Sequence, residues 1–76
     1  MKALITHVTE FQKEYKRITY NVVFYKDGLF LESRDVNVYT DKVIGAQSLL
    51  EALYTAVVEE GKAIGLEIAS EEIIKA

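Results

Sequence analysis

Side chains that carry out catalysis are sparse in this sequence of 76 residues. His7 is the one imidazole, and no cysteine is present to serve as a nucleophile or as a thiolate ligand of a metal. The serines Ser33, Ser48 and Ser70 lack the G-x-S-x-G context of a hydrolase nucleophile, and the four glycines form no phosphate-binding loop. We therefore predict a protein that is not an enzyme, holds no metal and needs no cofactor.

Acidic side chains are the remaining candidates for a metal site. Glu51 and Glu71 could share a divalent cation, but oxygen-ligand sites usually gather several acids at closer spacing. We interpret Glu51, Glu59 and Glu60 instead as the solvated face of a helix. Such an acidic face could also mimic nucleic acid or meet a basic partner protein.

Basic and aromatic side chains gather in one short stretch, where Lys13, Lys16 and Arg17 surround Tyr15. Tyrosines with nearby cations can stack on the bases of a single strand. The formal net charge of −3 works against this function, because neutralisation of phosphates drives such binding. Single-stranded nucleic acid is therefore an alternative partner, and not the one we favour.

The hydrophobic pattern that must position these side chains changes once, near residue 42. Before this point, apolar and polar residues alternate, and they are rich in the valine, threonine, tyrosine and phenylalanine that suit strands. We predict strands over 2–11, 16–26 and 29–39, with His7 on the same face as Ile5. The third strand changes phase in its middle, which indicates a bulge or an early exit from the sheet.

Asp27-Gly28 separates the second and third predicted strands, and this pair favours a type I′ hairpin turn. After Asp41, apolar residues recur at spacings of three and four, from Ala46 to Val57, as in an amphipathic helix. We predict a helix over 42–60, with Asp41 as its N-cap and Gly61 just beyond its end.

The last stretch, residues 66–76, is open to two interpretations. Leu66 to Ala69 alternate like a short strand, whereas Ser70 followed by two glutamates resembles the start of a helix. The predicted fold class is α+β: a three-stranded antiparallel meander packed by one long helix, with a short C-terminal strand or helical turn.

Length and composition limit the class of protein. Residues 1–76 predict a single small domain, and half of them are hydrophobic, which is typical of a globular chain. No apolar run approaches the roughly 20 residues that span a bilayer, so we expect a cytoplasmic protein and no membrane partner. A core this thin, without disulfides, gains from association with another chain.

The second face of the predicted sheet suggests how such an association could occur. One helix covers one face, while the other face also carries apolar and aromatic side chains. We therefore predict a non-enzymatic regulator, inhibitor or accessory protein that acts as a homodimer or docks on a partner protein; its size would suit a phage or prophage product. The predicted contact surface consists of Tyr15, Arg17, Val23, Tyr25 and Tyr39.

Three stretches carry a family resemblance: residues 20–28, Tyr39-Thr40 and residues 48–53. In this order, they predict a strand hairpin with a Lys-Asp-Gly turn and a helix that begins Ser-Leu-Leu-Glu-Ala-Leu. With this arrangement, the chain resembles the HicB-like antitoxin domain. The resemblance implies a partial ribonuclease H-like fold without nuclease chemistry, and an antitoxin as the alternative function. Residues 33–37 differ from the proline-containing stretch that this family usually has in its third strand.

Overall fold

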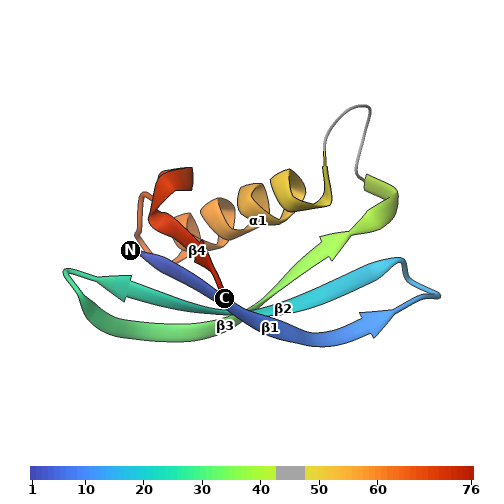
Figure 1. The fold of residues 1–76 in the computed structure, drawn as a ribbon, viewed down its shortest axis with the longest axis horizontal. Coiled ribbons are helices and arrows are strands. Elements are labelled where there is room, and N and C mark those ends of the chain that lie inside the picture. The colour runs from blue at the N-terminus through green and yellow to red at the C-terminus, as the bar shows by residue number, and fades with distance from the viewer. Residues whose placement is uncertain (43–47) are drawn as a thin grey trace.

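The chain folds into a four-stranded sheet with one long helix against one side (Figure 1). The computed structural model describes residues 1–42 and 48–76. The predicted α+β class, with its three-stranded meander and C-terminal strand, is confirmed. The elements are β1 (Ala3–Gln12), β2 (Arg17–Lys26), β3 (Leu29–Tyr39), the short 3₁₀ helix η1 (Thr40–Lys42), α1 (Leu49–Ala63), η2 (Ser70–Glu72) and β4 (Ile73–Lys75).

The strands follow the order β3-β2-β1-β4. The first three pair antiparallel, while β4 runs parallel to β1 and pairs with residues 3–5 of it. We call the side of the sheet that faces α1 the covered face and the other side the open face. The two hairpin turns lie at opposite ends of the sheet (Figure 1).

Both hairpin turns use residues with positive φ. Asp27 and Gly28 have φ values of 53° and 77°, which confirms the type of turn that the Asp-Gly pair favours. In the β1–β2 turn, the N–H of Lys16 donates to the carbonyl of Lys13 at 3.2 Å, and Lys16 itself has φ 51°. The β1–β2 turn is thus tightly folded, and its basic side chains Lys13 and Lys16 are exposed.

β1 contains two bulges that a strict alternation does not predict. Its register against β2 shifts between Ile5 and His7 and again between Val8 and Glu10. His7 is consequently opposite Asn21 on the open face, so the prediction that it shares a face with Ile5 is wrong. The bulge expected in β3 is present, because its pairing with β2 shifts beside Phe24.

The core lies between the covered face, the inner side of α1 and the segment that comes after α1. Phe24, Ile5, Leu53, Val22 and Val57 are its largest fully buried side chains. The other buried apolar residues are Ala3, Ile18, Tyr20, Val36, Val38, Leu66, Ile68 and Ile73.

The start of α1 differs from the prediction over 42–60. The helix begins at Leu49, and Ser48 is its N-cap: the Ser48 hydroxyl accepts the N–H of Glu51 at 3.1 Å. Asp41 is not the N-cap, because it belongs to η1. Residues 43–47, which include Ala46 of the predicted apolar stripe, lie outside the described residues.

The end of α1 also differs, since Gly61 is inside the helix and buried. Gly65, with φ 81°, takes the left-handed position just beyond the end. The N–H of Gly65 donates to the Lys62 carbonyl and that of Leu66 to the Gly61 carbonyl, at 3.1 and 2.9 Å, which is a Schellman motif. A Cβ on Gly61 would lie 2.5 Å from Cδ1 of Ile68, so the missing side chain makes room for the returning chain.

Both interpretations of residues 66–76 describe part of the C-terminal segment. The predicted helical turn is present as η2 at Ser70–Glu72. The strand is not at residues 66–69, where Leu66 and Ile68 are buried without strand pairing, but at Ile73–Lys75. The alternation there reflects packing of every second side chain into the core.

Candidate functional site

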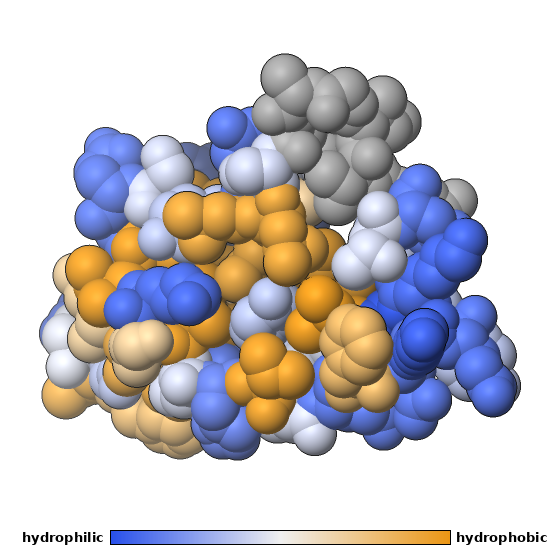
Figure 2. Space-filling view, turned by 45° about the vertical axis from the view of Figure 1, so that its right-hand side comes forward, coloured by the Kyte–Doolittle hydropathy of each residue, from blue (hydrophilic) through white to orange (hydrophobic). Residues whose placement is uncertain are grey.

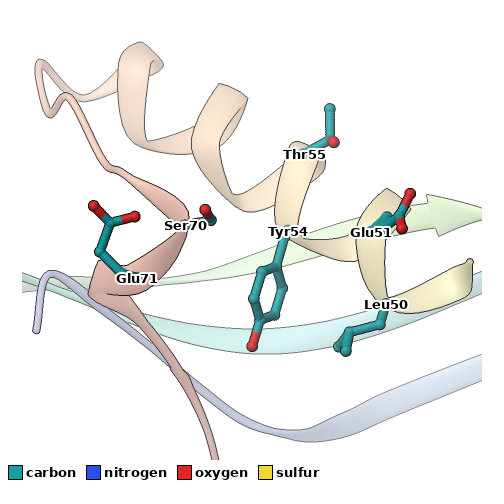
Figure 3. A pocket seen from close by; sticks show the side chains of 6 residues that line it. All are labelled: Leu50, Glu51, Tyr54, Thr55, Ser70 and Glu71. Carbon is teal, nitrogen blue, oxygen red and sulfur yellow. The ribbon is translucent and has the colours of Figure 1, made fainter. Parts of the chain in front are cut away.

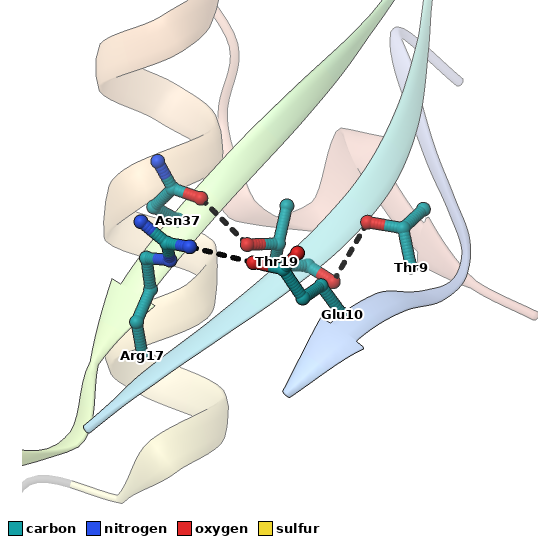
Figure 4. Close-up of polar contacts among 5 residues, drawn as sticks. All are labelled: Thr9, Glu10, Arg17, Thr19 and Asn37. Atoms are coloured by element: carbon teal, nitrogen blue, oxygen red, sulfur yellow. Dashed lines mark hydrogen bonds and ion pairs between the residues drawn. The ribbon is translucent and has the colours of Figure 1, made fainter. Parts of the chain in front are cut away.

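The central part of the open face consists of polar side chains that bond to one another (Figure 4). The Thr19 hydroxyl donates to Oδ1 of Asn37 at 2.8 Å, and the Thr9 hydroxyl donates to the Thr19 carbonyl at 3.3 Å. Beside them, Arg17 forms an ion pair with Glu10. The hydrogen bond that Arg17 donates to the Glu10 carboxylate, together with its charge, raises the pKa of the Arg17 guanidinium.

A second polar row crosses the same face one step further along the strands. The Thr6 hydroxyl lies 2.6 Å from Oδ1 of Asn21, and Nδ2 of Asn21 donates to the Ser33 hydroxyl at 2.8 Å. His7 is exposed, with its Nδ1 3.1 Å from the Thr6 hydroxyl. The two rows use much of the hydrogen-bonding capacity of the open face internally.

These rows divide the predicted contact surface into two groups. Val23 and Tyr25 lie partly buried toward the β2–β3 turn, whereas Arg17 and Tyr39 pair with each other across the sheet at the opposite end. Tyr15 joins the second group, because the Arg17 guanidinium lies 5.9 Å from the centre of its ring. The structure therefore places the five residues in two patches, and not in one.

The predicted acidic face is also divided. Glu59 pairs with Lys62 at 3.3 Å, and Glu60 reaches Arg34 of β3 at 3.2 Å. Glu51 lies apart from both, beside a hollow that Glu71 also lines. Two of the three predicted carboxylates are thus neutralised by partners within the chain.

The predicted basic cluster separates in a similar way. Arg17 is bound by Glu10, whereas Lys13 and Lys16 are exposed in the β1–β2 turn. No ion pair joins either lysine to another of the described residues, 1–42 and 48–76. The turn therefore offers two positive charges to a partner.

An apolar groove next to the first half of α1 is the feature that the sequence pattern did not reveal. One hollow of about 390 Å³ is lined by Tyr20, Leu49, Leu50, Leu53 and Lys75. A second hollow of about 670 Å³ adjoins it through Leu50 and is lined as well by Glu51, Tyr54, Thr55, Ser70 and Glu71. We call these two joined hollows the α1 groove.

Figure 3 shows how the second hollow is built. The ring of Tyr54 points from α1 toward the sheet and lies between Leu50 and η2, while Ser70 and Glu71 form the opposite wall. Leu49 and Leu50 are 39% and 47% exposed, although they sit in the helix that covers the core. The groove thus has an apolar floor and a carboxylate on each of its two walls.

Apolar exposure continues from the groove onto the neighbouring part of β1. Val8 and Phe11 pair with Tyr20 and Ile18, so they lie on the covered face, yet they are 50% and 62% exposed. Figure 2 shows apolar side chains spreading over the helix and the sheet on this side, bordered by hydrophilic ones. The width of the apolar stripe on the predicted helix was the one signal in the sequence for this groove, because the core does not bury Leu49 and Leu50.

Glu72 holds the η2 wall in place. Its carboxylate accepts the N–H of Ala69 at 3.0 Å and lies 3.5 Å from Nζ of Lys2. The hydrogen bond from Ala69, aided by the charge of Lys2, lowers the pKa of Glu72 below its ordinary value of 4.5. The ionised carboxylate therefore ties η2 to the start of the chain.

Comparisons with known proteins do not assign this surface: no family model, no curated protein and no solved structure matches the chain. Within residues 1–42 and 48–76, no three histidine, cysteine or acidic side chains gather in a way that could hold a metal ion. Among the same residues, α1 is too short and too polar to cross a membrane.

Proposed function

We propose that this chain is a non-enzymatic protein-binding module, a regulator, inhibitor or accessory protein, and that it binds through the α1 groove. One observation carries the proposal: large apolar side chains stay exposed in the groove and on the strand β1 beside it. Leu49 and Leu50 do so from α1, and Val8 and Phe11 from β1. Contiguous exposed apolar surface bordered by polar residues is typical of a protein interaction site.

The composition of the groove fits a protein partner. Tyr54 and the mostly buried Tyr20 line the groove with aromatic rings, and tyrosine is enriched in interfaces because it buries much area with few rotors. Covering this surface would also add to a small core. Each Å² of apolar surface removed from water contributes about 25 cal/mol to association before the entropic costs of binding.

The open face supports binding less well than the groove does. Its polar side chains already bond to one another, as in the Thr19–Asn37 and Asn21–Ser33 pairs. A partner would have to remove water from these groups without offering better bonds, and burial of polar groups is unfavourable unless their bonds are kept. We therefore move the proposed contact surface from the open face to the groove.

Matched bait variants test this function. Wild type, Leu50→Glu and Val23→Glu would be immobilised and exposed to extracts, and bound proteins would be quantified by mass spectrometry. We expect a protein that wild type and Val23→Glu retain and that Leu50→Glu loses, because a charge in the groove opposes an apolar contact. The interaction must then be reproduced with the purified partner.

Folding of the baits is checked by circular dichroism before capture. A retained protein that is lost with Val23→Glu and kept with Leu50→Glu would overturn the choice of surface. The proposed function would be overturned if wild type retained no protein at all, not even a second copy of the chain.

A further inference from the structure

We propose that the occupant of the α1 groove is the β1–β2 turn of a second copy of this chain, exchanged reciprocally in a two-fold dimer. The inference rests on the proposed function, since it names the partner of that same surface. It also joins two features described above: a groove with carboxylates and a turn with lysines that form no ion pair with another of the described residues.

The charges of the groove are available to a partner. In the part of the chain that the structure describes, no ion pair involves Glu51 or Glu71, whereas the neighbouring Glu59, Glu60 and Glu72 are each paired. The two available carboxylates stand on opposite walls of the hollow, one on α1 and one on η2. Lys75 also lines the groove, but the two carboxylates outnumber this cation, so the groove is complementary to an apolar group with a net positive charge.

The β1–β2 turn has this chemistry. Phe11 and Tyr15 are 62% and 65% exposed, and Lys13 and Lys16 are exposed with them. Two aromatic residues and two lysines are thus exposed within residues 11–16, together with Glu14, so this turn, at one end of the sheet, has a net positive charge (Figure 1). A ring can fill the apolar floor while an ammonium group approaches a carboxylate, and the pairing steers the two copies into register.

Symmetry favours a reciprocal exchange. Each chain has one groove and one such turn, so a two-fold axis lets both turns enter both grooves and leaves no contact open. A one-way contact would instead build a ring or an open filament.

The edges of the sheet are less suited to self-association. β1 has two bulges in the part that β4 leaves unpaired within the described residues, and bulges interrupt regular strand pairing. β3 points Glu32 and Arg34 toward the covered face, where they pair with Phe24 and Val22 of β2. Inward-pointing charges of this kind oppose the addition of another strand.

The charge distribution of the chain predicts a dimer that is sensitive to salt. Residues 1–42 carry seven basic and six acidic side chains, and residues 43–76 carry two basic and six acidic ones. Exposed pairs are screened by ions, with a screening length of about 8 Å at physiological ionic strength. We expect association to weaken as salt is raised.

A charge exchange between two variants tests the dimer. Sedimentation velocity and light scattering would compare wild type with the turn variant Lys13→Glu/Lys16→Glu and the groove variant Glu51→Lys/Glu71→Lys. We expect a mass of twice 8.6 kDa for wild type and at least about tenfold weaker association for each variant alone. An equimolar mixture of the two should regain the dimer, because each turn then meets a groove of opposite charge.

Lys26→Glu, which changes a lysine at the other hairpin turn, is the control and should leave association unchanged. Thermal melts verify that each variant is folded. The inference is overturned if wild type remains a monomer at high micromolar concentration, if the two variants stay dimeric, or if their mixture stays monomeric. If wild type is a monomer that binds another protein, and Leu50→Glu abolishes this binding, the dimer is ruled out while the proposed function is retained.

Discussion

The two halves of α1 face the same sheet but are packed differently. Toward its end, Val57 is fully buried, and Gly61 lets Ile68 approach the helix backbone. Toward its start, Leu49 and Leu50 remain 39% and 47% exposed beside a groove. The same apolar pattern therefore builds a core toward one end of the helix and leaves apolar side chains exposed at the other.

The difference comes from the segment that packs against each half. After Ala63 the chain reverses through Gly65, and Leu66 and Ile68 return against the helix and become buried. On the other half, the hollow between the helix, Tyr20 and η2 stays open among the described residues. A glycine in the helix interior, which usually costs about 1 kcal/mol, is compensated here by close packing.

The largest predicted effect separates two leucines on the same helix. Leu53 is 1% exposed, and we expect Leu53→Ala to lower the free energy of unfolding by about 2–5 kcal/mol, because it leaves a cavity in the core. Leu50→Ala should change it by no more than about 0.5 kcal/mol. Denaturant unfolding measures both, and similar losses for the two variants would contradict the difference in burial between Leu53, which faces the core, and Leu50, which faces the groove.

Gly61→Val should give the next largest loss. The new side chain would overlap Ile68, and overpacking of this kind costs about 1–3 kcal/mol. Ala63→Val is the matched control, since Ala63 lies exposed in the last turn of the same helix and should lose only a few tenths of a kcal/mol. Equal melting temperatures for the two variants would contradict the close approach of the returning chain.

Ser48→Ala tests the open half. Loss of the hydroxyl that accepts the Glu51 N–H should cost about 1 kcal/mol, whereas Ser48→Asp should retain the cap and its stability. Hydrogen exchange would locate the effect, and we expect faster exchange in the first turn of α1 with little change near Val57. Uniformly faster exchange along the helix would mean that the two halves unfold as one unit.

The smallest effect depends on pH. Because the folded-state pKa of Glu72 is lowered, its contribution to stability is present above the ordinary value of 4.5 and is lost as the pH falls through the folded value. We therefore expect Glu72→Gln to melt below wild type at pH 7, with a smaller difference at pH 3. Glu71→Gln is the control for removing one neighbouring carboxylate, and a difference for Glu72→Gln that persists at pH 3 would contradict the linkage.

The local signals in the sequence predicted the sheet well. Alternation located the three long strands to within one residue at each end, and Asp27-Gly28 located their second turn. These features depend on neighbours in sequence, which a pattern records directly. The bulges in β1 escaped prediction because they depend on pairing with β2, and this error placed His7 on the wrong face.

Long-range contacts account for the remaining errors. The sequence pattern predicts Gly61 just beyond the end of the helix. Its role in the structure is to leave room for Ile68, whose position is set by the fold. The α1 groove likewise joins Tyr20, Leu50 and Glu71, which are widely separated in the chain. The periodicity of apolar residues identifies each helix or strand and its apolar side, but it does not show which of these residues no other element of the fold covers.

The pairing of β4 with β1 has a consequence for the order of folding. It joins Ile73 to Ala3, a separation of 70 positions, whereas both hairpins close locally. Contacts of such separation carry a larger loop-closure entropy and tend to form late. Since η2 directly precedes β4 and forms one wall of the α1 groove, we expect the groove to be completed late in folding.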